Sequence, residues 1–487
     1  MSFTSTIFIA FLAAFFLLYW TAGKMKPAVQ NYLLLIGSYS FYAFTSWKFL
    51  LLLIGLSFIN FILGIQIEKN ENLTKRRLYV WTGLILGVGS LAYFKYLNFF
   101  IESFNSLFNT IGLNASINTL KIIIPFGISY YTFKNIGYLL DVDKSKTVVC
   151  KNWLSYFNYI AFFPTILSGP IDSARNFIPQ LQKKRVFNYS QASDGMRQIL
   201  WGLFKKMVIA NNLSMISDPI FDNYANLPAS SLLLGALFFA IQLYADFSGY
   251  SDIAIGTGHL LGFNVTQNFD YPFFAQNIAE FWRKWHISLT SWLTEYVFTP
   301  LTITFRNWGK AGLILAIVIN ITICGIWHGA NWTYALFGFI HGCLFIPLIL
   351  RGKMNKRKKR IKNRYLPTLK ELFNIVSTFV VVVFTFILFR SKSVKDAFAY
   401  YAGIFSKSES GITTFEKKLL NGEAFILVFL LLFLLILEWT GRNDQYAIEK
   451  WGKNYHPLVR TIFYALLLFL IGMYSPTSET PFLYLKF

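Results

Sequence analysis

The feature that most constrains this chain is a succession of apolar segments, each about as long as a bilayer is thick. Near the start they cover residues 3–22, 30–46, 48–67 and 78–94, and about twenty apolar residues are needed to cross a membrane as a helix. With 55% hydrophobic and only 14% charged residues, the chain has more apolar surface than a soluble core could bury. The sequence therefore predicts an all-α polytopic membrane protein of roughly ten to twelve transmembrane helices.

The positive charges predict how the chain is oriented. The formal net charge is +22, but the Lys and Arg residues are gathered in short loops, most of all at 24–26, 69–77 and 351–364. Such clusters are typical of cytoplasmic loops rather than of a nucleic-acid-binding surface, and the last of them is also suited to contact anionic lipid headgroups. We therefore expect both termini of the chain, including the tail 476–487, outside the cytoplasm.

Nothing in the sequence indicates a separate module. Cys150, Cys324 and Cys343 lack the paired spacing of a disulfide framework or a zinc site. A metal site at His286 and His328 is an alternative, but no carboxylate stands at a clear ligand spacing to them, so no metal or bound cofactor is expected. We predict one integral-membrane domain over residues 1–487. It would comprise N-terminal spans in 1–94, a catalytic core in 95–350, C-terminal spans in 351–475 and the tail in 476–487.

The middle of the chain predicts interrupted helices. Between residues 95 and 220 the apolar runs are short and broken by Pro and Gly. Irregular backbone at membrane depth is tolerated only where protein or a water-filled cavity covers it, so we expect half-inserted helices around a cavity. Residues 193–216 carry Arg197, Lys205 and Lys206 among apolar residues, which favours an interfacial helix on the cytoplasmic side.

Two carboxylates, Asp246 and Asp252, lie within an apolar segment. A carboxylate in such a setting needs a partner, either a nearby cation or a hydroxyl group. Tyr244 and Ser248 are the neighbouring hydroxyl groups in the sequence.

Three of the five histidines, His286, His328 and His341, lie between residues 280 and 342. An ionisable residue at membrane depth is a functional hypothesis, and imidazole is the usual general acid or base near neutral pH. A structural hydrogen bond is an alternative for His328 and the preferred interpretation for His341. The charge pattern places His328 in the outer half of the membrane and His286 nearer the cytoplasm, so the two would approach a site from opposite faces.

The chain closes with FLYLKF, residues 482–487. Its aromatic residues are suited to anchor the chain at the membrane interface. The phenol of Tyr484 is also a potential acyl acceptor once a base removes its proton.

At this point a set of motifs resembles the membrane-bound O-acyltransferase family and, within it, the bacterial polysaccharide (alginate-type) O-acetyltransferase branch. The motifs follow one another along most of the chain: IPFGISYYTF (124–133), SGPI (168–171), GLFKKMVIAN (202–211), YADFSGYSDIAIG (244–256), NFDYPF (268–273), FWRKWHISLTSWL (281–293), WHGANW (327–332) and the closing FxYxxF.

The resemblance implies a fold and a set of site residues. The expected core is a central funnel with a tunnel to the cytosol, through which an acyl thioester enters. His328 would be the catalytic histidine at the constriction, His286 the second histidine, and Tyr484 an acyl relay to an extracytoplasmic SGNH-type partner. Further candidates for the tunnel or for substrate binding are Asp246, Ser248, Arg283, Trp285, Trp327 and Asn331.

The predicted function is that of a membrane O-acyltransferase in the bacterial cytoplasmic membrane. It would move acetyl from cytosolic acetyl-CoA toward an extracytoplasmic alginate-like polysaccharide, peptidoglycan or another cell-wall glycan. One alternative is a D-alanyl transferase of the teichoic-acid type, which takes its acyl group from a carrier-protein thioester. A second alternative, from another class, is a glycan or lipid transporter or flippase, because interrupted helices also mark those proteins.

Overall fold

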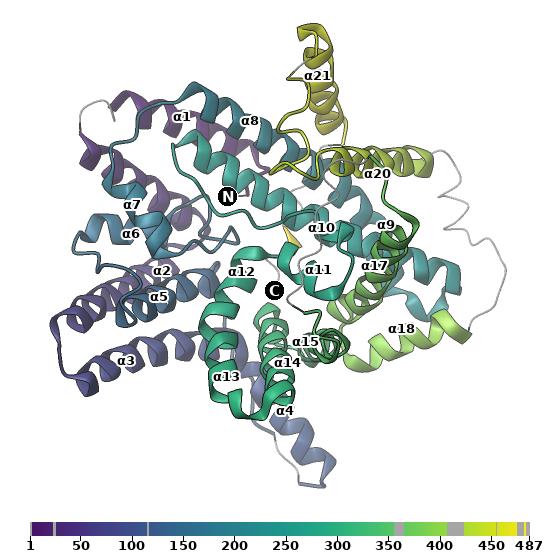
Figure 1. Ribbon diagram of the computed structural model, residues 1–487, viewed down its shortest axis with the longest axis horizontal. Coiled ribbons are helices and arrows are strands. Elements are labelled where there is room, and N and C mark those ends of the chain that lie inside the picture. Colours follow the sequence, from purple (N-terminus) through teal and green to yellow (C-terminus); the bar gives the residue numbers. More distant parts are fainter. Residues whose placement is uncertain are drawn as a thin grey trace. The chain divides into compact units, whose positions relative to one another are not determined.

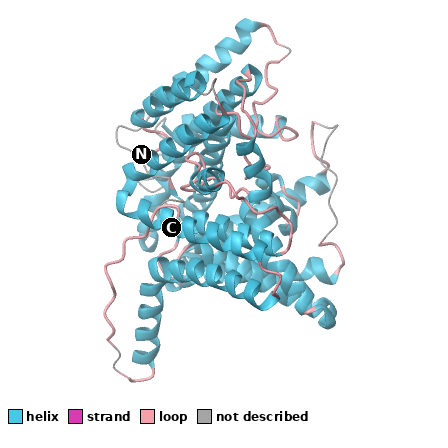
Figure 2. Cartoon of the chain, turned by 90° about the vertical axis from the view of Figure 1, so that its left-hand side faces the viewer, coloured by secondary structure: helices cyan, strands magenta, loops and turns pink. Residues whose placement is uncertain are grey.

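The computed structural model describes residues 2–22, 26–113, 116–354, 365–406, 423–453, 455–474 and 482–483. Throughout these ranges the regular elements are helices, joined by loops and turns, and no strand occurs in them (Figure 2). The predicted all-α fold is confirmed. The chain divides into two compact units, the first formed by residues 1–192 with 258–266 and the second by 193–257 with 267–486.

Six helices in the described ranges are long and apolar enough to cross a membrane: Pro27–Lys69, Leu73–Thr110, Ala229–Leu260, Arg306–His328, Trp332–Leu350 and Leu369–Arg390. Three shorter apolar helices cover Thr6–Ala22, Ile426–Thr440 and Pro457–Met473. The protein is thus a multi-pass membrane protein. Helix α2 (Pro27–Lys69) accounts for two of the predicted spans, because its backbone leaves the helical region at Ser46, with φ −165° and ψ 112°.

The first unit contains helices α1 to α7. After α1 (Thr6–Ala22) and α2 come α3 (Leu73–Leu91), α4 (Leu97–Thr110), α5 (Ile128–Asp143), α6 (Trp153–Ala161) and α7 (Ala174–Gln182). Helix α2 packs against α1, α3, α5 and α6 (Figure 1). The buried Arg185 links the first two helices, since Nε donates to the Tyr19 hydroxyl at 2.6 Å and Nη2 to Asn31 Oδ1 at 2.6 Å.

In the interrupted region, helix α5 and the residue before it pack directly on the segment 159–167. Helix α5 begins after Gly127, which has φ +70°, and a Cβ at this position would lie 2.2 Å from the carbonyl oxygen of Ile166. Only glycine fits both the left-handed backbone and this close approach. On α5, Lys134 Nζ donates to Thr165 Oγ1 at 3.0 Å and to the Tyr159 carbonyl at 3.2 Å, so the irregular segment after α6 is held by buried polar contacts.

The second unit contains most of α8 and α10, the helices that follow α10, and both histidine motifs. Those that matter for the site are α8 (Tyr189–Leu203), α10 (Ala229–Leu260), α11 (Ile278–Lys284), α12 (Ile287–Leu293), α14 (Gly309–His328), α15 (Trp332–Cys343), α17 (Leu369–Arg390), α20 (Glu423–Thr440) and α21 (Pro457–Met473). With 7 residues each, α11 and α12 extend only about 10 Å. Both are therefore too short to cross a bilayer.

Helices α14 and α15 form a tight hairpin that carries His328 (Figure 1). A Cβ on Gly325 would lie 2.2 Å from the Tyr334 carbonyl oxygen and 2.9 Å from the Cα of Gly338. Small residues allow helix backbones to approach this closely inside a membrane. The hairpin fixes the end of α14, where His328 stands.

The prediction for residues 193–216 was wrong. Instead of an interfacial helix with exposed lysines, α8 continues into a π-helical segment, Phe204–Ala210, and Lys205 and Lys206 are only 3% and 2% exposed. The two charges suggested a polar helix surface. Each lysine in fact faces a buried carboxylate, and a periodic sequence pattern does not reveal such partners. Such π-helical segments are rare in proteins, and those that occur are often found at functional sites.

Candidate active site

His286 stands at the junction of α11 and α12 in a left-handed backbone conformation, with φ 46° and ψ 53°. This conformation is uncommon for a residue with a side chain. The adjoining backbone is held by Asn268, whose carbonyl oxygen accepts the Ile287 N–H at 2.8 Å. Its side-chain Oδ1 accepts the Ser288 hydroxyl at 2.9 Å. The strained turn is thus fixed from outside the two short helices.

The His286 imidazole is completely buried. Its Nδ1 lies 3.0 Å from Asn268 Oδ1, and the Asn268 amide is oriented by its donation to Ser251 Oγ at 3.1 Å. Because a carbonyl oxygen only accepts hydrogen bonds, we assign the proton to Nδ1 and the lone pair to Nε2. Burial lowers the pKa of His286 to about 3, so the imidazole is neutral at physiological pH.

His328 is brought to the same site by α14. Its side chain is 3% exposed, and its ring centroid lies 6.4 Å from that of His286. Trp327 contacts both rings, at 5.6 Å from His286 and 5.1 Å from His328, while Phe389 of α17 packs on His328 at 5.1 Å. The two histidine motifs, about forty residues apart in sequence, therefore meet at one buried, aromatic-lined site.

His341 occupies a structural position instead. The Trp282 indole donates to His341 Nδ1 at 3.2 Å, and His341 Nε2 lies 2.8 Å from Thr385 Oγ1. The Thr385 hydroxyl donates onward to the Val382 carbonyl at 2.8 Å, so Nε2 carries the proton that this hydroxyl accepts. With both ring nitrogens engaged, His341 links α11, α15 and α17.

The predicted partners of the buried carboxylates are present. Asp246 Oδ1 pairs with Lys206 Nζ at 2.5 Å, and Asp252 Oδ2 pairs with Lys205 Nζ at 2.6 Å. Ser248 joins the second pair by accepting from Lys205 at 2.9 Å. The need for a cation was foreseen, but the two lysines were not named.

Tyr244 and Glu438 complete this polar region. Tyr244 donates to Glu438 Oε1 of α20 at 2.8 Å. Lys205 Nζ lies 5.7 Å from the centroid of the Tyr244 ring, so the phenol is in contact with the second ion pair. The hydroxyl of Tyr244 therefore donates its hydrogen bond to the carboxylate of Glu438 rather than to Asp246 or Asp252.

A small pocket is lined by residues of this polar region and by Asn268. Its lining includes Lys205, Asp252 and Glu438 together with Ser251 and Asn268. Asn268 thus has its side chain in contact with both the pocket and His286. The lining also takes in Tyr244, Ser248, Tyr271, Gln267 and the loop residues 445–447.

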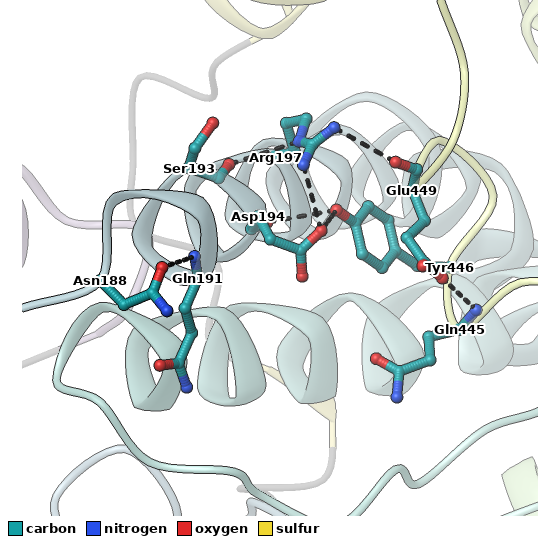
Figure 3. Close-up of polar contacts among 8 residues, drawn as sticks. All are labelled: Asn188, Gln191, Ser193, Asp194, Arg197, Gln445, Tyr446 and Glu449. Atoms are coloured by element: carbon teal, nitrogen blue, oxygen red, sulfur yellow. Dashed lines mark hydrogen bonds and ion pairs between the residues drawn. The ribbon is translucent and has the colours of Figure 1, made fainter. Parts of the chain in front are cut away.

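The loop that forms one wall of this pocket is anchored on α8 (Figure 3). The Tyr446 hydroxyl donates to Asp194 Oδ1 at 2.7 Å, Asp194 pairs with Arg197 at 3.3 Å, and Arg197 donates to the Glu449 carbonyl at 3.2 Å. The Gln445 N–H closes the loop on Glu449 Oε2 at 2.7 Å. The wall of the pocket is therefore fixed by a chain of polar contacts.

The other candidates from the sequence have different surroundings. Arg283 is exposed and donates to the Ala279 and Met354 carbonyls. Trp285 is buried in an aromatic cluster, stacked on Phe281 at 5.5 Å. Asn331 caps α15 by accepting the Thr333 N–H at 3.0 Å. Tyr484 lies outside the described residues.

Asn268 is the site residue that reasoning from single residues missed. Its side chain is not ionisable, so a search for ionisable residues at membrane depth does not find it. The available signal was its place at the start of the NFDYPF motif.

The fold and the site define a multi-pass helical membrane protein with two imidazoles buried side by side at one aromatic-lined site. The chain is a member of the membrane-bound O-acyltransferase family. The model of that family matches residues 151–357, and the probable alginate O-acetylase AlgI of Pseudomonas putida is 32% identical over 511 aligned positions, covering 100% of both chains. The resemblance of the motifs is thereby confirmed.

Two further relatives carry different activities in their names. The peptidoglycan O-acetyltransferase of Helicobacter pylori is 31% identical over 438 positions, covering 82% of this chain and 79% of that protein. The teichoic acid D-alanyltransferase of Streptococcus thermophilus is 30% identical over 310 positions, covering 57% of this chain and 71% of that protein. All three names are those of acyltransferases, and this chain is an acyltransferase.

Substitution of Asn268 should impair the site without removing an imidazole. In Asn268→Leu the His286 ring loses the acceptor that fixes its tautomer, and we expect acyl transfer to fall about tenfold or more, the equivalent of one hydrogen bond of about 1.5 kcal/mol. The matched control is Ser251→Ala, which removes only the contact on the far side of the Asn268 amide. Initial rates of acyl transfer measure both, and equal losses in the two variants would contradict the role given to Asn268 Oδ1.

Proposed function

We propose that this protein transfers an acetyl group from acetyl-CoA toward an extracytoplasmic polysaccharide. The observation that carries the proposal is the buried pair His286 and His328, with rings 6.4 Å apart, in a chain of the membrane-bound O-acyltransferase family. The names of relatives that match most of this chain, an alginate O-acetylase and a peptidoglycan O-acetyltransferase, favour acetyl as the acyl group and a glycan as the final acceptor.

In the proposed reaction His328 is the general base. It takes the proton of the acceptor hydroxyl as the oxygen attacks the thioester carbonyl. The new C–O bond forms, the C–S bond breaks, and the proton passes from the imidazolium to the departing thiolate. General-base help of this kind contributes about 10² to 10⁴ in rate.

His286 has a complementary part in this scheme. Its Nδ1 proton is engaged by Asn268, so Nε2 is an acceptor. A neutral acceptor near His328 stabilises the imidazolium that forms on His328 when it has taken the proton of the attacking hydroxyl. The pocket lined by Lys205 and Asn268 is the proposed approach of the thioester.

The topology proposed from the charges fits this direction of transfer. With the basic loops in the cytoplasm of a bacterial cell, the donor arrives from inside, and both termini lie on the far side of the cytoplasmic membrane. Tyr484 is then the proposed acyl relay, from which an SGNH-type partner would take the acetyl group.

Intact-mass analysis of the purified protein after incubation with acetyl-CoA tests the proposal. An acetyl adduct that maps to Tyr484 is expected, and it should be absent from Tyr484→Phe, which keeps the aromatic ring but deletes the hydroxyl. Glycan acetylation in cells should fall with it. Normal glycan acetylation in Tyr484→Phe would identify the tail as an interface anchor and remove the relay.

The second candidate is D-alanyl transfer from a carrier-protein thioester, which the similarity to a teichoic acid D-alanyltransferase favours. The two candidates differ in the donor. An adduct that forms with a D-alanyl carrier protein and fails to form with acetyl-CoA would select the second candidate.

A further inference from the structure

The C-terminal segment is seated inside the second unit at residues 482–483. Phe482 is 1% exposed, and its ring stands edge-on to Tyr250 of α10, with centroids 4.9 Å apart at 88°. The Lys206 ammonium lies 4.5 Å from the centroid of the Phe482 ring, within the range of a cation–π contact. The start of the FxYxxF motif is therefore enclosed by side chains of α10 and the π-helical segment.

Asp246 holds the backbone of the same segment. One carboxylate oxygen pairs with Lys206 at 2.5 Å, and the other accepts the Leu483 N–H at 2.8 Å. The side chains of Lys206 and Asp246 are 3% and 2% exposed. A hydrogen bond from a backbone N–H to a buried carboxylate is charge-assisted and about twice as strong as one between neutral groups.

The neighbouring ion pair shows that this contact is more than the ordinary satisfaction of a buried charge. Lys205 and Asp252 are similarly close, at 2.6 Å, and they hydrogen-bond to Ser248 and Gln198, side chains of the same helical elements. The Lys206–Asp246 pair instead binds the backbone of Leu483, which lies 237 residues from Asp246 in the sequence. The first pair therefore has its hydrogen-bond partners within neighbouring helices, whereas the second binds the tail.

We propose that Asp246, Lys206 and Tyr250 form an intramolecular docking site for the C-terminal segment and act as positioning residues for Tyr484. The inference rests on the proposed function insofar as Tyr484 is the residue that receives the acyl group. Docking itself is a separate property that can be measured without any reaction.

The geometry of α10 relates the docking site to the histidines. Asp246 and Tyr250 are four residues apart and share one face of the helix. The next residue after each contacts the active site: the Phe247 ring lies 4.7 Å from His286, and Ser251 accepts from Asn268. The same two turns of α10 thus bind the tail and support His286, and Tyr484 is the next residue in the sequence after the docked Leu483.

Hydrogen–deuterium exchange of the C-terminal peptide in the full-length, detergent-solubilised protein tests the docking site. The variant Asp246→Leu/Lys206→Met removes the acceptor and both charges without leaving either charge alone. We expect tail amides to exchange about 10- to 100-fold faster in this variant, the effect of losing one hydrogen bond to a charged group. The matched control, Lys205→Met/Asp252→Leu, removes the neighbouring pair and should leave the exchange rate of the tail unchanged.

A conservative variant provides the rescue. Asp246→Asn/Lys206→Gln keeps a side-chain oxygen for the Leu483 N–H and should restore most of the protection. Rapid exchange of the tail in the unmodified protein would overturn the docking site. So would equal loss of protection in the Lys205→Met/Asp252→Leu control, because general loosening of α10 would then explain the effect.

The acetyl adduct on Tyr484 separates this inference from the proposed function. If positioning is correct, the adduct falls at least tenfold in Asp246→Leu/Lys206→Met and returns in Asp246→Asn/Lys206→Gln. A released tail that is still acetylated at the original rate would overturn positioning. A third outcome is that the unmodified protein forms no adduct, although its tail is protected from exchange and loses this protection in Asp246→Leu/Lys206→Met. That result would uphold docking while the proposed function fails.

Discussion

His328→Ala should reduce acyl transfer by about 10²- to 10⁴-fold, the contribution of a general base, while the protein remains folded in the membrane. The substitution removes a ring that is 3% exposed and contacts Trp327 and Phe389, so the aromatic walls remain. Initial rates with labelled acetyl-CoA, together with the elution profile in size-exclusion chromatography, measure the two properties separately.

The control for this experiment is His456→Ala. His456 is exposed, and its Nδ1 caps α21 by accepting the Leu458 N–H at 3.3 Å. His456→Ala makes the same chemical change away from the buried site, and we expect the rate of acyl transfer to be unaffected. Full activity in His328→Ala would remove His328 from the mechanism, and with it the central element of the proposed function.

The second large effect concerns stability. In Lys205→Met the Asp252 carboxylate loses the ammonium at 2.6 Å, and a buried charge without its counter-charge destabilises a protein by about 3–5 kcal/mol. Removal of both charges in Lys205→Met/Asp252→Leu should recover most of that loss, because no ion then remains buried alone. Unfolding of the purified protein in mixed micelles by increasing denaturing detergent gives the free-energy differences.

An exposed ion pair of the first unit sets the scale. Lys151 pairs with Glu68 at 3.1 Å, with side chains 74% and 36% exposed, and Lys151→Met should cost less than about 1 kcal/mol. A loss in Lys205→Met no larger than this would mean that Asp252 does not carry its charge in the folded protein.

Much of the fold could be predicted because apolar length and basic loops are properties of single segments. The predicted spans 30–46 and 48–67 correspond to the two halves of α2 on either side of Ser46. The approach of His286 and His328 to one site was also foreseen, because the short apolar run after His286 suggested a half-inserted helix and the charges placed His328 in the outer half of the membrane.

The residues that could not be predicted are those whose role depends on contacts with side chains distant in the sequence. Lys205 and Lys206 were taken for surface charges because helical periodicity gives a face but not what covers it. Asn268 was passed over because its role exists only through the His286 ring 3.0 Å away. For His341 the sequence favoured a structural role, and the contacts with Trp282 and Thr385 support it.

The left-handed backbone at His286 bears on how far this protein can be stabilised. A residue with a Cβ is disfavoured there by roughly 1–2 kcal/mol relative to its usual conformations, and glycine would relieve that cost. Glycine would also empty the space of a fully buried ring that contacts Phe247 and Asn268, and emptying the volume of a buried ring costs about 3–5 kcal/mol. A search for thermostable variants is therefore expected to keep His286. Selection for heat resistance and selection for turnover therefore both retain the imidazole, in spite of the strained backbone that carries it.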